Sequence, residues 1–214
     1  MKILFILGSM MIVLCLAAPN AVSSFAKEVG PSAVWNPRDG QWEAIHKKCS
    51  RGKRKLFVSC IALSMSQKGA SPQAVEFTKL MKGEVYLSSF SEMGKVDVAE
   101  ITSPLLNDPI VTDTILVNGF PQVIDLWDKV QNIDITRAQN YSALVRRFPN
   151  LELWPMKGFK TMQRLPQGGQ RFIIEFTLMN GCRGCEVAGG AEIAFDFDDS
   201  GKFLRTSLIG LIQY

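Results

Sequence analysis

Residues 171–178 read Arg-Phe-Ile-Ile-Glu-Phe-Thr-Leu, and this stretch decides the fold. Polar side chains alternate in it with apolar ones, at Phe172, Ile174, Phe176 and Leu178. Because successive side chains of a strand point to opposite faces, this period of two predicts a strand at 170–179 with one buried face. Three further strands are predicted around it, at roughly 157–165, 190–198 and 202–212, so the C-terminal part is predicted to be an antiparallel four-stranded meander.

The N-terminal part has the period of helices instead. Trp42, Ile45 and Cys49 recur at spacings of three and four, which predicts a helix at 41–49. A second helix is predicted at 53–67, and we expect its inner side to carry Leu56, Phe57, Cys60, Ile61 and Leu63. A third helix begins at Ser71-Pro72, since serine caps free N–H groups and proline suits the first helical position.

Shorter elements are predicted between these two regions. Residues 85–87 fit a strand, 95–102 fit either a strand or a helical turn, and 113–126 fit a hairpin around Asn118-Gly119. A fourth helix is predicted at 136–148, with Tyr141, Leu144, Val145 and Phe148 on one side.

Helices and strands are thus segregated along the chain, which favours an α+β fold over a parallel α/β sheet. We expect N-terminal helices followed by a mainly antiparallel sheet that ends in the four-stranded meander. One domain is predicted over 27–214, helical at about 41–82 and rich in strands at about 84–214.

The first 26 residues have the pattern of a secretory signal peptide. Lys2 precedes the apolar run 3–18, and Ser24-Phe25-Ala26 forms a small-residue cleavage site, so the predicted cut lies between Ala26 and Lys27. Cleavage after residue 17 or 18, lipidation at Cys15 and an uncleaved anchor are the alternatives. No later apolar stretch approaches the roughly 20 residues of a membrane span. The sequence therefore predicts a periplasmic or secreted protein with no transmembrane span after signal cleavage.

The charge balance gives little indication of a partner. The 214-residue chain carries 24 Lys and Arg against 20 Asp and Glu, a net charge of +4 that removal of Lys2 lowers to about +3. Neither this balance nor the compartment suggests nucleic acid. The basic cluster at 47–55 fits a solvated turn, and contact with anionic lipid or a polyanion is its alternative.

Four cysteines follow the predicted cut: Cys49, Cys60, Cys182 and Cys185. An even number in an exported protein favours disulfides. Proximity favours the pairs Cys49–Cys60 and Cys182–Cys185, with cross-pairing or free thiols as alternatives.

Cys182-Arg-Gly-Cys185 has the spacing of thiol–disulfide oxidoreductases, in which a helix N-terminus stabilises the first thiolate. Gly189 and Gly190 follow closely and disfavour a helix, so a structural staple is the preferred interpretation. With Cys49, the one histidine, His46, would complete a formal four-ligand zinc set, but no short spacing supports it. We expect His46 to face solvent, and we predict no catalytic residue, metal or cofactor.

The stretch 180–203 and Gly69-Ala-Ser-Pro72 resemble uncharacterised exported bacterial proteins with a C-terminal sheet of this kind. The resemblance implies a bacterial envelope context and brings no activity. We therefore expect a non-enzymatic periplasmic or secreted binding or envelope module, whose partner is another envelope protein or a small ligand. The alternative is a thiol–disulfide oxidoreductase using Cys182 and Cys185, and a hydrolase using carboxylates alone is a weaker third class.

Overall fold

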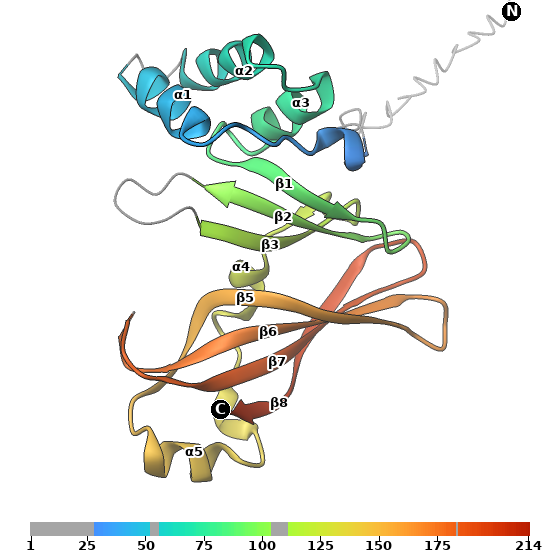
Figure 1. Ribbon diagram of the computed structural model, residues 1–214. Coiled ribbons are helices and arrows are strands. Elements are labelled where there is room, and N and C mark those ends of the chain that lie inside the picture. The colour runs from blue at the N-terminus through green and yellow to red at the C-terminus, as the bar shows by residue number, and fades with distance from the viewer. Residues whose placement is uncertain (1–27, 52–55, 104–110, 183) are drawn as a thin grey trace, which may run out of the picture.

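The computed structural model of the chain describes residues 28–51, 56–103, 111–182 and 184–214 (Figure 1). The predicted signal peptide and its cut between Ala26 and Lys27 lie outside these residues. The helical elements are η1 Pro31–Ala33, α1 Gln41–Ser50, α2 Phe57–Gln67, α3 Pro72–Leu80, α4 Leu126–Val130, η3 Ile135–Arg137 and α5 Tyr141–Arg147. The strands are β1 Tyr86–Ser91, β2 Asp97–Ser103, β3 Val111–Val117, β4 Val123–Ile124, β5 Leu151–Arg164, β6 Gln170–Asn180, β7 Val187–Phe197 and β8 Phe203–Gln213.

The strands form two antiparallel sheets, each of four strands in sequence order. The first sheet is β1-β2-β3-β4, and the second, β5-β6-β7-β8, is the predicted meander. N-terminal helices followed by antiparallel sheets confirm the α+β prediction. Residues 95–102, which fitted two structures in the sequence, belong mainly to β2, whose register with β3 is regular along its whole length.

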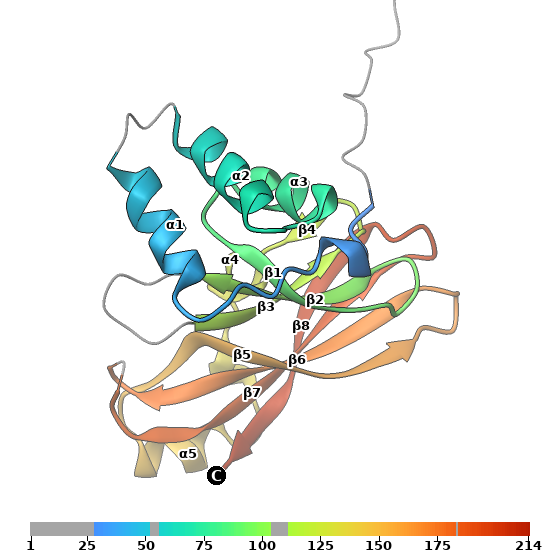
Figure 2. The same ribbon diagram turned by 45° about the horizontal axis from the view of Figure 1, so that its top comes forward.

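The elements are stacked in layers, with α1, α2 and α3 over one face of the first sheet and the second sheet under the other (Figures 1 and 2). Alternate residues of the first sheet therefore face different layers. Ala99 and Ile115 pack in a cluster with Phe77 of α3. Val98 and Leu116, one position along each strand, pack instead against the second sheet.

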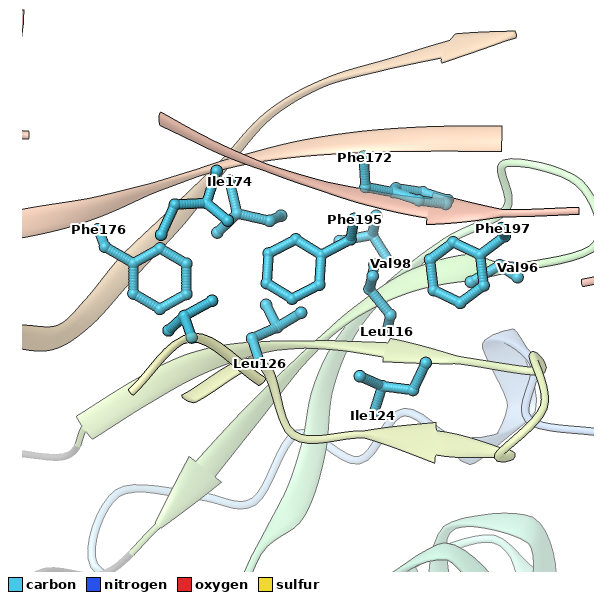
Figure 3. Close-up of a cluster of buried hydrophobic side chains, with 12 residues drawn as sticks. Val96, Val98, Leu116, Ile124, Leu126, Phe172, Ile174, Phe176, Phe195 and Phe197 are labelled. Carbon is cyan, nitrogen blue, oxygen red and sulfur yellow. The ribbon is translucent and has the colours of Figure 1, made fainter. Parts of the chain in front are cut away.

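The core between the sheets is built from the alternation that the sequence shows at 171–178. Phe172, Ile174 and Phe176 are fully buried and point at the first sheet and α4, together with Phe195 and Phe197 of β7 (Figure 3). Burying one such side chain contributes about 1.5–3 kcal/mol, so this cluster is a main source of the stability of the fold.

The first sheet covers only part of the long strands of the second. Beyond it the buried face of β6–β8 packs against α5, where Leu144 and Phe148 meet Leu178, Ala191 and Leu211. The predicted helix at 136–148 is thus divided into η3 and α5, but its predicted apolar side is confirmed. The short helix α4, which the sequence did not indicate, begins at Leu126 after the cap Asp125.

The cap of α3 is as predicted, because the Ser71 hydroxyl accepts from the Ala74 N–H at 2.9 Å. The predicted inner side of α2 is partly wrong. Leu56 and Leu63 are 59% and 62% exposed, whereas Ala62 and Met65 are buried. Apolar side chains occur around much of this helix, so the sequence alone does not orient it.

One buried amide joins the two sheets. The Gln170 side chain is 2% exposed, and its Oε1 accepts from the N–H groups of Lys95 and Val96 at 3.0 and 2.9 Å. Its Nε2 donates to the carbonyls of Met93 and Val96 at 3.2 and 3.0 Å. A side chain of the second sheet thus pairs with the backbone at the start of β2.

Two backbone hydrogen bonds join the sheets beside this amide. The Phe120 N–H donates to the Gly201 carbonyl at 2.9 Å, and the Phe203 N–H donates to the Phe120 carbonyl at 3.0 Å. Phe120 lies in the β3–β4 loop, which is longer than the two-residue turn that Asn118-Gly119 suggested and contains a cis bond before Pro121.

The start of the described chain is held by a partly buried polar group, the side chain of Asn118. Asn118 takes a left-handed conformation with φ 67°, and its side-chain amide exchanges hydrogen bonds with the N–H and carbonyl of Val29 at 2.8 and 2.7 Å. Asn118 Nδ2 also donates to Asp97, which is 2% exposed. The segment that follows the predicted cleavage site is therefore fastened to the first sheet.

Candidate functional site

A cleft of about 400 Å³ lies between the two sheets, on the β1–β3 side of β5. It is lined by Ser89, Ser91, Val98, Ala99, Glu100, Thr112, Thr114, Lys157, Gly158 and Phe159. Pockets for small molecules in proteins range from about 300 to 1,000 Å³, so this volume suits a small ligand.

The cleft exists because the inner face of the first sheet changes character along its strands. Toward the start of β2 this face presents Val98 and Leu116, which pack on the phenylalanines of the second sheet. Further along it presents the hydroxyl groups of Ser89, Thr112 and Thr114. Hydroxyl groups retain water or polar partners more readily than they pack against aromatic rings, so the two sheets are not closed by apolar contact at this end.

The second sheet contributes an irregular strand to the same cleft. The pairing of β5 with β6 shifts between Leu153 and Lys157 and again between Phe159 and Thr161. Extra residues in a strand bend it locally and redirect its side chains. The register places Lys157 opposite Phe176 and Phe159 opposite Ile174, and a partly buried Phe159 lines the cleft.

Lys157 is the buried cation of this site. Its side chain is 1% exposed, and Nζ lies 2.5 Å from Oδ1 of Asp113 on β3. Nζ also approaches the Pro155 carbonyl at 3.5 Å. A buried ammonium group is costly unless it is paired, so the Asp113 carboxylate, itself 37% exposed, makes its position tolerable. This ion pair connects the two sheets at the wall of the cleft.

Glu100 is the anion of this site. It is exposed on β2, opposite Ser89 of β1 and Thr114 of β3 in register. Among the described residues, no ion pair or hydrogen bond engages its carboxylate. The cleft therefore combines an unpaired hydrogen-bond acceptor with several hydroxyl groups and one aromatic ring.

The cysteines lie away from this cleft in two separate pairs. Cys49 and Cys60 join α1 to α2, with a sulfur–sulfur distance of 2.01 Å. Cys182 and Cys185 close the turn between β6 and β7 at 2.05 Å. These are the pairs that proximity in the sequence favours. Because each of these four cysteines is disulfide-bonded, none of them is free to serve as a thiolate ligand for zinc.

The C-x-x-C turn lacks the helix that redox enzymes place after this motif. The Asn180 N–H donates to the Glu186 carbonyl at 2.9 Å, and β7 begins at Val187. The backbone around Cys182 and Cys185 is therefore that of a hairpin turn. Cys182 is exposed, so a thiol in solution has access to it.

His46 is half-buried rather than facing solvent, contrary to expectation. Its ring lies between those of Trp42 and Phe57, at centroid distances of 5.7 and 5.1 Å. Burial lowers the pKa of its imidazole, and the Glu84 carboxylate opposes that shift. The aromatic side chains around it explain the burial, and no group of three metal-ligating side chains occurs in the part of the chain that the structure describes.

The outer face of the second sheet carries a carboxylate between two arginines. Asp196, 3% exposed at its side chain, pairs with Arg171 through two hydrogen bonds of 2.7 and 2.8 Å and with Arg205 at 3.1 Å. The hydrogen bond from Arg171 is the largest cause of the lowered pKa of Asp196. Because both arginines pair with the one Asp196 carboxylate, this cluster of charges stabilises the sheet rather than offering a reactive group.

Sequence analysis identified the cysteine pairs but not the cleft. The cleft-lining residues come from four strands, and a serine or threonine on a strand carries no local signal of its neighbours. No helix within the described residues is long and apolar enough to cross a membrane.

Comparison with known proteins leaves the site to be interpreted from its own chemistry. No protein-family model, no curated protein and no solved structure matches the chain.

Proposed function

We propose that this is an exported, non-enzymatic binding protein and that the cleft between its sheets is the ligand site. The observation that carries the proposal is the Glu100 carboxylate, which has no partner among the described residues and lies beside the hydroxyl groups of Ser89 and Thr114 on one face of the first sheet. Such a lining hydrogen-bonds a small molecule rich in hydroxyl groups, and Phe159 offers an apolar surface for its C–H face. We therefore infer a sugar-like ligand.

The predicted export signal and the two disulfides support an extracytoplasmic site of action, periplasmic or secreted. The cleft supports binding rather than catalysis, because the Lys157 ammonium group is already paired with Asp113 and no second acid or base of the described lining pairs with Glu100 for proton transfer.

The test is calorimetric titration of the mature protein with a panel of common mono- and disaccharides. We expect at least one to bind, and we expect Glu100→Gln and Thr114→Val each to weaken that binding at least tenfold. Glu152→Gln is the matched control, since Glu152 is exposed on β5 outside the cleft. A panel without binding, or equal binding by Glu100→Gln and the wild type, would contradict the proposal.

The exposure of Cys182 supports one alternative function, a thiol–disulfide oxidoreductase that uses Cys182 and Cys185. This alternative predicts an oxidising reduction potential and an insulin-reductase activity that Cys182→Ser abolishes. The hairpin after the motif favours a staple, for which we expect resistance to glutathione and no such activity.

A further inference from the structure

The outer side of α2 exposes two large apolar residues. Leu56, at its N-cap, and Leu63 are 59% and 62% exposed. They are seven residues apart, which is about two turns, so they lie above one another on the helix. Single exposed leucines are common on protein surfaces, so the neighbouring side chains decide whether this pair belongs to a binding surface.

Exposed cations lie at the end of α1 that the disulfide joins to α2. Lys47, Lys48 and Arg51 end α1, and the Cys49–Cys60 bond brings that end to α2 with a Cα–Cα distance of 5.6 Å. Among the described residues no acidic side chain pairs with these three cations. The α2 sequence contains no acidic residue at all, and Glu43 in the first turn is the only one in α1.

The helical layer places this surface at an outer corner of the molecule. The end of α1 and the start of α2 lie together there, on the side of the layer turned away from the second sheet (Figures 1 and 2). Nothing in the described chain covers it, and the cleft opens elsewhere, between the sheets.

We propose that this corner, formed by Lys47, Lys48, Arg51, Leu56 and Leu63, binds the surface of a bilayer that contains anionic lipid. A soluble polyanion uses the cations alone, whereas exposed leucines beside them gain from contact with the acyl boundary. Each basic residue near an anionic surface strengthens binding about fivefold. The disulfide keeps the leucines and the cations on one rigid unit, so binding needs no folding of a new segment.

The test is co-sedimentation of the mature protein with vesicles of phosphatidylcholine, alone or mixed equally with phosphatidylglycerol. We expect binding to the mixed vesicles only, weakened as salt is raised. Reversing two charges in Lys47→Glu/Lys48→Glu lowers the affinity by about 25-fold or more. Leu63→Ser weakens binding several-fold, and its effect persists at the highest salt concentration at which the wild type still binds.

Two control variants separate this corner from general surface effects. Arg164→Glu reverses an exposed charge at the end of β5, and Leu204→Ser removes a side chain that is 53% exposed on β8. Both should bind as the wild type does, and all variants should keep its unfolding temperature. Equal binding to both vesicle types, insensitivity to Leu63→Ser, or binding to soluble heparin without binding to vesicles would overturn the proposal.

Discussion

Replacing Gln170 by leucine tests whether one buried amide holds the two sheets together. Leucine has a similar volume but neither accepts nor donates, so four hydrogen bonds to the backbone at residues 93–96 are lost. The two bonds to Val96 are buried, and each backbone group left unsatisfied there costs about 1–3 kcal/mol. The other two are partly buried, where water takes the place of the amide.

We expect a net loss of about 2–4 kcal/mol, because burial of the leucine side chain offsets part of the cost. Urea unfolding followed by tryptophan fluorescence measures it as a lowered midpoint with an unchanged slope. Gln163→Leu, at an exposed position near the end of β5, is the control and should change stability by less than about 0.5 kcal/mol. A loss below about 1 kcal/mol for Gln170→Leu would refute the reasoning.

Gln170→Glu tests the acceptor and the donor of this amide separately. A glutamate keeps the acceptor for the Lys95 and Val96 N–H groups, but once ionised it faces the carbonyls of Met93 and Val96 without a proton to donate. The folded state therefore raises the pKa of this carboxyl above its unfolded value. Stability relative to the wild type should accordingly fall as the pH rises above about 4.3.

Three further predictions concern the polar and covalent links of the fold. The pKa of Asp196 is lowered in the folded protein, so its carboxylate stabilises the fold fully above the unfolded pKa of about 3.9, and this stabilisation is lost as the pH falls through the folded pKa. Asp196→Asn should therefore lower the free energy of unfolding, measured in urea, by about 1–3 kcal/mol at pH 7 and by less at pH 3. Breaking the disulfides should cost about 3 kcal/mol for Cys49→Ser and about 2 kcal/mol for Cys182→Ser, since the sequence separations they bridge are 11 and 3 residues; equal losses in urea unfolding would argue against loop entropy as the cause. Asn118→Gly keeps the positive φ but removes the side chain that holds Val29, so hydrogen exchange of residues 28–35 should rise while that of the second sheet stays unchanged.

The elements that the sequence predicts well are those with local signals. The alternation at 171–178 requires no knowledge of the rest of the chain, and Ser71-Pro72 marks the start of α3 by capping chemistry alone. Leu63 shows where such signals fail, because its helix has apolar residues on more than one side and only tertiary packing selects the buried one.

The candidate site depends on contacts between residues far apart in the sequence. Lys157 pairs with Asp113, which lies 44 positions earlier in the sequence, and the sequence around either residue gives no signal of the other. The cysteine pairs could be predicted because proximity in the sequence favours one pairing over the others. The cleft, in contrast, lies where the two sheets no longer pack against each other. Predicting it needs the relative placement of both sheets, which the chain specifies only through the whole core.

The two sheets are fastened unevenly. The Gln170 amide and the Phe120 backbone bonds lie together at one end of the sandwich, while the Lys157–Asp113 ion pair is the contact that spans the sheets beside the cleft. The two sheets are thus joined by hydrogen bonds at one end and by an ion pair beside the cleft, in addition to the apolar cluster around Phe172 and Phe195. Because the hydrogen bonds lie at the other end, loss of the ion pair alone would break none of them.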